Sequence, residues 1–353
     1  METIGILNSG GDCPGLNAVI CGATRAAQIQ GWRVLGFTDG FEGLLPEGGD
    51  YVVLDGASTA GILPLGGTIL GITNRGHFRT KGRGLSAETL NAARKTYDTL
   101  GLRALVVIGG DGSMGTALHL AEVGFNIVAV PKTIDNDLDA TARTFGFDSA
   151  VQCVTDSLDR LHTTTTSHRR VMIVEVMGRN AGWIALHGGL AGGADIILLP
   201  EIPYDNEKII ETIKARDEAG RKSTMIVVAE GAMPLHGRPQ RRVTADGENR
   251  LGGIADTLAR AITSHVPQDV RTCVLGHLQR GGNPTALDRI LGAGFGVHAV
   301  ELIAEERYDM MVNYINNRFS SVPISHAVHK ARRVSPQSDL VRIARIMGVS
   351  FGD

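Results

Sequence analysis

Two short polar stretches of the sequence carry residues that suit the handling of phosphate, a metal ion and a proton. The first, GGDGS at residues 109–113, combines glycine backbone amides with the carboxylate of Asp111. The second, PKTIDND at residues 131–137, brings the carboxylates of Asp135 and Asp137. One carboxylate can hold Mg²⁺ beside phosphate oxygens, and another can take the proton of an attacking hydroxyl. Together they indicate a magnesium-dependent phosphoryl transferase that acts on a small anionic substrate.

Both stretches follow short runs of apolar and β-branched residues, at 104–108 and 126–130, which predict buried strands of a parallel sheet. Between these strands we expect a helix from about residue 114 to 123. Open α/β sheets bind ligands at the edge where the carboxyl ends of their strands meet. We therefore expect both stretches at that edge. NSGGDCPGLN at residues 8–17, between another strand and helix, predicts a further anion-binding loop.

Strand and helix patterns alternate along the chain, which predicts an α/β fold with two similar three-layer domains and mainly parallel sheets. The length of 353 residues suits two domains. Near the crossover between them, residues 148–161 read as a helix and residues 162–170 as a loop, because a run of threonines resists helix formation. The expected domains are 1–147 with about 279–305, and about 148–278 with 306–353.

Composition excludes several classes of partner. The net charge of -2 argues against a nucleic acid or a membrane surface, and no apolar run approaches the roughly 20 residues of a membrane helix. The four scattered cysteines lack zinc-binding spacing and predict a reducing, cytoplasmic location. The chain begins directly in a strand pattern, so we expect no signal peptide.

Arginines are available to bind one or two phosphates: Arg170, Arg179, Arg271 and Arg280.

Five motifs, taken together and in this order, resemble those of the 6-phosphofructokinase family. They are SGGDCPGLNA, GGDGS, PKTIDND, VMGRNAGW and VLGHLQRGGNPTALDRIL, and the resemblance runs from about Ile4 to Val300. It implies a phosphofructokinase-like fold with a nucleotide domain first and a sugar-phosphate domain second. It also implies a glycolytic kinase that uses ATP and Mg²⁺ to phosphorylate carbon 1 of fructose 6-phosphate, giving fructose 1,6-bisphosphate and ADP.

The resemblance assigns roles to the matching residues. Asp135 resembles the catalytic base, assisted by Thr133, Asp137 and Arg179. Residues that resemble ATP contacts are Gly11, Arg75, Gly110, Asp111, Gly112 and Ser113, with Asp111 also the metal ligand. Residues that resemble substrate contacts are Thr133, Asp135, Arg170, Met177, Gly178, Arg179, Glu230, Arg271, His277 and Arg280. Arg170 and Arg271 match arginines that reach in from a neighbouring subunit, so the resemblance implies a homotetramer with shared active sites.

Two positions bear on the choice of phosphoryl donor. Pyrophosphate-using members resemble GGDD with PKTIDND, and many bacterial ATP-using members resemble GGDGS with PGTIDND, whereas this chain combines Gly112 with Lys132. An aspartate at 112 would place a carboxylate where the α-phosphate of ATP must pass, and glycine removes that repulsion. We therefore expect ATP as the donor. A pyrophosphate-dependent enzyme of the same fold is the alternative.

More distant alternatives explain less of the sequence. A lipid or NAD kinase would share the GGDG loop but not PKTIDND, VMGR and GHLQRGG together. A non-catalytic sugar-phosphate sensor would lack a base or a metal ligand, whereas Asp111 and Asp135 are both present. The family's effector site is matched only in part, by Arg25, Arg221 and Lys222. We therefore expect weaker control by nucleotide diphosphates or phosphoenolpyruvate.

Overall fold

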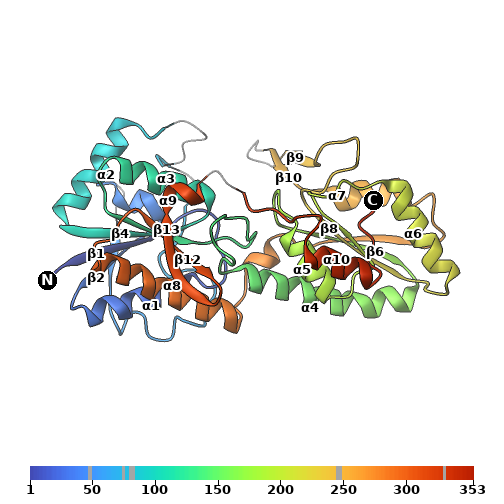
Figure 1. Ribbon diagram of the computed structural model, residues 1–353, viewed down its shortest axis with the longest axis horizontal. Helices are drawn as coiled ribbons and strands as arrows, with labels where there is room; N and C mark the ends of the chain where they lie inside the picture. The colour runs from blue at the N-terminus through green and yellow to red at the C-terminus, as the bar shows by residue number, and fades with distance from the viewer. Residues whose placement is uncertain (47–49, 74–75, 79–83, 244–248, 329–330) are drawn as a thin grey trace. The chain divides into compact units, whose positions relative to one another are not determined.

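The chain folds into two α/β units and passes between them several times (Figure 1). The computed structural model describes residues 1–46, 50–73, 76–78, 84–243, 249–328 and 331–353. Unit 1 comprises Met1–Thr133, Leu138–Ser149 and Arg280–Ala331. Unit 2 comprises Ile134–Asp137, Ala150–Gln279 and Arg332–Asp353. Each unit is described by itself below.

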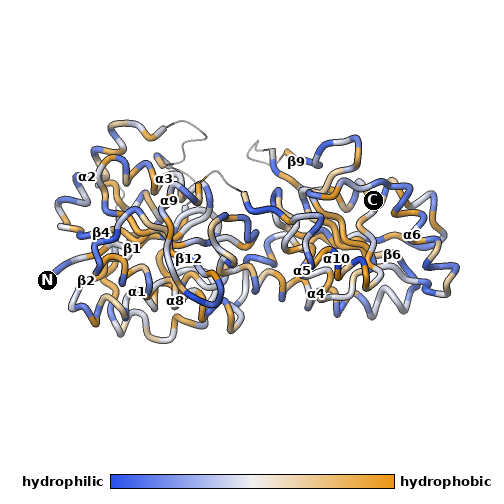
Figure 2. The backbone as a smooth tube through the Cα atoms, in the orientation of Figure 1, coloured by the Kyte–Doolittle hydropathy of each residue, from blue (hydrophilic) through white to orange (hydrophobic). Residues whose placement is uncertain are grey.

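Unit 1 is built on a seven-stranded sheet in the order β13-β12-β5-β4-β1-β2-β3. The strands are β1 (Thr3–Asn8), β2 (Arg33–Phe37), β3 (Tyr51–Leu54), β4 (Leu102–Gly109), β5 (Ile127–Pro131), β12 (Met310–Ile315) and β13 (Arg318–Pro323). The five central strands are parallel, and β3 and β13 pair antiparallel at the two edges. Every residue of β1 and β5 is buried, as expected for a parallel sheet covered on both faces. Hydrophobic residues concentrate along these strands in Figure 2.

Helices cover both faces of this sheet (Figure 1). One face carries α1 (Leu16–Ile29) and α8 (Ala286–Ala304), and the other carries α2 (Ala87–Thr99), α3 (Asp111–Glu122) and the short α9 (Ile324–Ala327). A 3₁₀ turn, η1 (Gly40–Leu44), joins the second layer. Helices α1 and α8 approach closely at Gly22 and Gly296. A Cβ on either glycine would collide with a backbone carbonyl of the other helix, so the approach requires glycine at both positions.

Unit 2 has a four-stranded parallel sheet in the order β11-β6-β8-β7. Its strands are β6 (Val171–Val176), β7 (Ile196–Leu198), β8 (Thr224–Ala229) and β11 (Val270–Val274). Helices α6 (Asn206–Glu218) and α7 (Ile254–Ile262) share one core with the sheet. The remaining helices are α4 (Phe147–His168, which starts in unit 1), α5 (Trp183–Ala191) and α10 (Asp339–Ile346). A hairpin of β9 (Arg241–Val243) and β10 (Asn249–Leu251) precedes α7, and the turn η2 (Gly276–Arg280) follows β11.

The architecture confirms the predicted α/β fold with mainly parallel sheets, but one segment differs. The prediction of a loop over residues 162–170 is wrong, because α4 continues to His168. The hydroxyls of this segment bond back to the helix, from Thr163 to the Arg160 carbonyl (2.8 Å) and from Ser167 to the Thr163 carbonyl (2.7 Å). Thr165 is buried, so packing in unit 2 overrides the low helix propensity of threonine.

The chain returns to unit 2 at Arg332, whereas the sequence-based division placed this return at residue 306. The difference concerns the two strands β12 and β13. They belong to unit 1 because β12 pairs in parallel with β5, and β13 pairs with β12.

Within the described residues, no helix combines the length and apolar character needed to cross a bilayer.

Candidate active site

The first glycine loop of unit 1 connects β1 to α1. It turns through two left-handed glycines, Gly10 with φ 82° and Gly15 with φ 106°. Arg280 lies on this loop, and its Nη1 donates a hydrogen bond to the Asp12 carbonyl at 3.0 Å. A Cβ on Gly11 would lie 2.5 Å from the same nitrogen. The glycine therefore allows the guanidinium to lie directly against the loop backbone.

A second cation, Lys132, reaches the same loop from the end of β5. Lys132 is only 3% exposed, and its ammonium donates a hydrogen bond to the Gly11 carbonyl. Its backbone N–H donates to the Gly109 carbonyl at 2.8 Å, which links the loops that follow β4 and β5. Next to it, the Thr133 carbonyl accepts a hydrogen bond from the Thr144 hydroxyl at 2.8 Å. Two positive charges and several glycine amides thus converge in unit 1, as in sites that bind phosphate.

The second glycine loop leads directly into α3. The helix begins at Asp111, earlier than the predicted start near residue 114, and Gly110 precedes it in an extended conformation. The amides of the first turn have no intrahelical partner, and the positive end of the helix attracts anions. Ser113 is buried, whereas Asp111 and Gly112 are exposed, and a Cβ on Gly112 would meet nothing within 4 Å. This helix start therefore offers one carboxylate and free space beside an anion-binding turn.

The donor set at Asp111 suits Mg²⁺, which binds proteins through one or two carboxylates and takes substrate phosphates as further ligands. In the part of the chain that the structure describes, no group of three His, Cys, Asp or Glu side chains could hold a metal ion by itself.

The acceptor loop, Ile134–Asp137, belongs to unit 2. Asp135 is only 3% exposed, and its Oδ2 lies 3.6 Å from Nε of Arg179, whose side chain is 64% exposed. Arg179 has a φ of 52°, which is uncommon for a residue other than glycine, and such conformations cluster at functional sites. Its backbone N–H donates to Oε1 of Glu230 at 2.9 Å. Asp135, Arg179 and Glu230 are thereby brought together at the carboxyl ends of β6 and β8.

Burial raises the pKa of Glu230, although hydrogen bonds from the Arg179 and Gly178 amides act in the opposite direction. Gly178 has a φ of 141°, and a Cβ there would lie 2.5 Å from the Ala181 carbonyl. The neighbouring Met177 donates its N–H to Oε1 of Gln279 at 3.2 Å. The fully buried Gln279 also donates to the Gly276 carbonyl at 3.1 Å and so ties Met177 to the turn η2, where His277 is exposed.

Arg170 and Arg271 lie together at a different place in unit 2. Both contact Oδ2 of Asp269, Arg170 through Nε at 3.2 Å and Arg271 through Nη2 at 2.9 Å. They mark the amino ends of β6 and β11, whereas Met177 follows the carboxyl end of β6. A strand of this length separates the two ends by about 16 Å at roughly 3.3 Å per residue. Within unit 2, these arginines are therefore remote from the acceptor loop.

Two supporting residues were missed by the sequence analysis, and one predicted residue lies outside the described part of the chain. Gln279 gave no signal beyond its place in GHLQRGG. Glu175 had one, since it is a carboxylate inside the apolar run VMIVEV. It is buried and accepts hydrogen bonds from the amides of Gly253 and Ala255 at the start of α7, at 2.9 Å each. Arg75, a predicted ATP contact, is not among the described residues.

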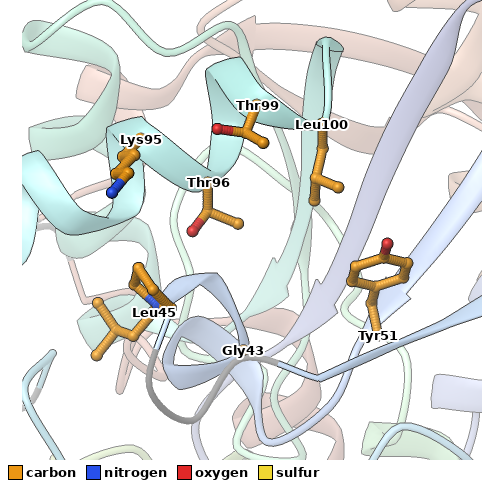
Figure 3. Close-up of a pocket in the computed structure, with 8 residues that line it drawn as sticks. Gly43, Leu45, Tyr51, Lys95, Thr96, Thr99 and Leu100 are labelled. Carbon is orange, nitrogen blue, oxygen red and sulfur yellow. The ribbon is translucent and has the colours of Figure 1, made fainter.

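Three other candidate features are a cysteine on the first glycine loop and two hollows. Cys13 is buried, and burial raises the pKa of its thiol to about 12, so it carries no reactive thiolate at neutral pH. Arg221 and Lys222 line a hollow of about 570 Å³ with Arg169 and Arg216. Figure 3 shows a smaller hollow of about 220 Å³, where Lys95 and Thr96 of α2 face Leu45 after η1. Its mainly apolar lining does not suit a phosphorylated ligand.

Comparisons with known proteins identify the family of the chain. A family profile described as Phosphofructokinase matches residues 3–303. A Chloroflexus aggregans protein named ATP-dependent 6-phosphofructokinase is 50% identical, over 100% of this chain and 98% of its own length. A Streptomyces coelicolor protein named pyrophosphate–fructose 6-phosphate 1-phosphotransferase is 44% identical over 99% of both chains. The solved phosphofructokinase of Saccharomyces cerevisiae matches with a TM-score of 0.81 and 31% identity, over 93% of this chain and 45% of the yeast chain.

Proposed function

The chain belongs to the phosphofructokinase family, and we propose that it transfers the γ-phosphoryl group of ATP to the carbon-1 hydroxyl of fructose 6-phosphate. The products are fructose 1,6-bisphosphate and ADP, and the reaction is a step of glycolysis. The observation that carries this proposal is the buried carboxylate of Asp135, which lies 3.6 Å from the guanidinium of Arg179 in unit 2. A base beside an exposed cation is the combination that phosphoryl transfer to a hydroxyl requires.

On the acceptor side, Asp135 takes the proton of the carbon-1 hydroxyl as its oxygen attacks the γ-phosphorus. Arg179 neutralises charge that develops on the transferred group, and its exposed side chain can follow that group. Glu230, Met177 and Gly178 position the sugar. From the resemblance of GHLQRGG, we assign His277 and Arg280 of the turn η2 to its 6-phosphate. The new oxygen–phosphorus bond forms while the bond from the γ-phosphorus to ADP breaks.

On the donor side, the two glycine loops of unit 1 bind the ATP phosphates through backbone amides. The donor contacts that we propose are Gly11, Gly110, Asp111, Gly112 and Ser113, together with Arg75. The chemistry of this loop fits Mg²⁺ held by Asp111 and by the phosphates, where the ion would offset negative charge on the phosphoryl group. Thr133 and Asp137 lie two residues before and two residues after the base, and we propose that they assist it.

The preference for ATP is supported by the open position of Gly112, which leaves space for an α-phosphate. Lys132 could have favoured pyrophosphate, but its ammonium already bonds to the Gly11 carbonyl, a role that serves either donor. Pyrophosphate remains the second candidate donor because the Streptomyces coelicolor relative named for it is 44% identical. A non-catalytic sensor is disfavoured, since Asp111 and Asp135 are both present.

We also propose a homotetramer in which Arg170 and Arg271 complete the sugar-phosphate site of a neighbouring subunit. Their place at the amino ends of β6 and β11, remote from the acceptor loop of their own unit, supports this assignment. A cytoplasmic location is supported by four cysteines that are free thiols in the structure.

The decisive experiment compares initial rates with ATP and with pyrophosphate at saturating fructose 6-phosphate and Mg²⁺. We expect a higher kcat/KM with ATP than with pyrophosphate, because Gly112 leaves space for the α-phosphate and places no carboxylate beside it. Turnover with pyrophosphate alone would overturn the assignment of the donor, and the absence of turnover with either donor would overturn the proposed function.

A further inference from the structure

A short segment near the C-terminus lies against the acceptor loop. This segment, Ala331–Val334, is called the strap below. Ala331 pairs antiparallel with Leu138, immediately after the acceptor loop. The backbone N–H of Arg332 then donates to the carbonyl of Asp137 at 2.8 Å. The strap therefore meets the chain directly beside the proposed catalytic base.

Arg332 also binds the start of α5. Its guanidinium carbon lies 4.4 Å from the ring centroid of Trp183, a cation–π contact. The indole N–H of Trp183 donates to the Arg332 carbonyl at 3.1 Å. One residue thus contacts Asp137 through its amide, and Trp183 through both its carbonyl and its side chain. Trp183 ends the VMGRNAGW motif that contains Arg179.

A half-buried carboxylate makes a second link between the strap and α5. Glu201 accepts a hydrogen bond from the Val334 N–H at 2.9 Å and another from the Gly182 N–H at 3.0 Å. The strap is consequently attached to the start of α5 at two places, directly through Arg332 and through Glu201 at Val334. Since Arg179 lies on the loop that leads into α5, the strap joins the two segments that carry Asp135 and Arg179.

We propose that Arg332 is a positioning residue for the acceptor loop, which holds the Asp135 carboxylate at its place beside the Arg179 guanidinium. This inference rests on the proposed function. The acceptor loop continues directly from β5 of unit 1, yet it belongs to unit 2. The Asp135–Arg179 ion pair and the bond from Arg332 to Asp137 attach it there. Loss of the contact between Arg332 and Trp183 loosens the second attachment, and displacements of about 1 Å at a reacting group can lower rates about 100-fold.

The test compares three variants with the wild-type enzyme. Arg332→Ala removes the contact with Trp183, and Arg332→Lys keeps a cation there. Arg342→Ala is the matched control, because Arg342 is exposed on α10 in the same C-terminal segment and pairs with Asp339 on its own helix. For Arg332→Ala we expect a roughly ten-fold lower kcat, with KM for fructose 6-phosphate and Tm close to wild type. Arg332→Lys should recover a large part of the rate.

Amide hydrogen exchange of a peptide that spans residues 133–140 provides a readout that does not depend on activity. We expect exchange there to be several-fold faster in Arg332→Ala and unchanged in Arg342→Ala. Unchanged exchange in the acceptor loop would overturn the inference, as would a lower Tm with an unchanged kcat per folded enzyme. If the wild type turned over neither ATP nor pyrophosphate, the proposed function would fall, and the exchange result would still decide whether Arg332 orders the loop.

Discussion

The Gly112→Asp variant tests the physical basis of donor choice. Residue 112 lies in the first turn of α3 and is exposed, and a Cβ added there would have no atom within 4 Å. An aspartate therefore fits without displacing a neighbour. A negative charge in the first turn of a helix also interacts favourably with the helix dipole, by about 0.3–1 kcal/mol. We expect Gly112→Asp to fold with a Tm equal to or slightly above that of the wild type.

The expected effect on ATP follows from the added charge. Two unit charges about 5 Å apart in a medium of effective dielectric constant about 20 repel each other by about 3 kcal/mol, or roughly 10²-fold in affinity. Solvent screening at this exposed position lowers the effect, so we expect kcat/KM for ATP to fall by about 10- to 100-fold. Pyrophosphate has no third phosphate to meet this charge, and its kcat/KM should fall by less than about 3-fold or rise.

The assay measures kcat/KM for both donors in Gly112→Asp and in Gly112→Asn, which fills the same space without the charge. The asparagine variant should retain most of the activity with ATP. If both variants lost ATP activity equally, bulk rather than charge would be responsible. A kcat/KM for ATP in Gly112→Asp within about 3-fold of wild type would refute the reasoning altogether.

Three further predictions concern the base, the first glycine loop and a buried carboxyl. Asp135→Ser should lower kcat by about 10²–10⁴-fold while calorimetry still detects fructose 6-phosphate binding; a smaller loss would argue against a base at this position. Since the methyl group of Gly11→Ala would displace Arg280, the double variant Gly11→Ala/Arg280→Ala should lose no more kcat/KM than Arg280→Ala alone. Burial raises the pKa of Asp288 from 3.8 to about 6, despite hydrogen bonds from Ser149. Between about pH 4 and pH 6 the folded protein therefore keeps a proton on Asp288 that the unfolded chain has released. Its contribution to the free energy of unfolding therefore falls by about 3 kcal/mol from about pH 4 to pH 7, and urea titrations should show that Asp288→Asn loses this dependence.

The parts of the fold that could be predicted are those with a local signature. The buried strands β4 and β5 follow from short β-branched runs, and the loops that end them follow from glycine and carboxylate residues in those positions. Gly10 and Gly15 adopt left-handed conformations that favour glycine, so the first loop was also visible in the sequence. Roles for single residues such as Glu230 and His277 came from the resemblance rather than from spacing.

Contacts between distant parts of the chain could not be predicted. The indole of Trp183 meets Arg332 across 149 positions, and Gln279 meets Met177 across 102 positions, with no local pattern that marks either pair. The threonine run was misjudged for a related reason, since burial of Thr165 depends on the rest of unit 2. The helix α3 begins at Asp111, earlier than predicted. The low helix propensity of glycine hides this start in the sequence, and tertiary structure stabilises it.

The pairing of β12 with β5 has a consequence for how the chain folds as it leaves the ribosome. About 180 residues separate the end of β5 at Pro131 from the start of β12 at Met310. At about 5–20 residues per second, roughly 9–36 s of synthesis pass before β12 exists. Throughout this interval the nascent chain carries β5 with one open backbone edge, and for most of it α1 lacks α8, whose backbone packs against Gly22. The sheet of unit 1 is therefore completed only after most of unit 2 has been synthesised.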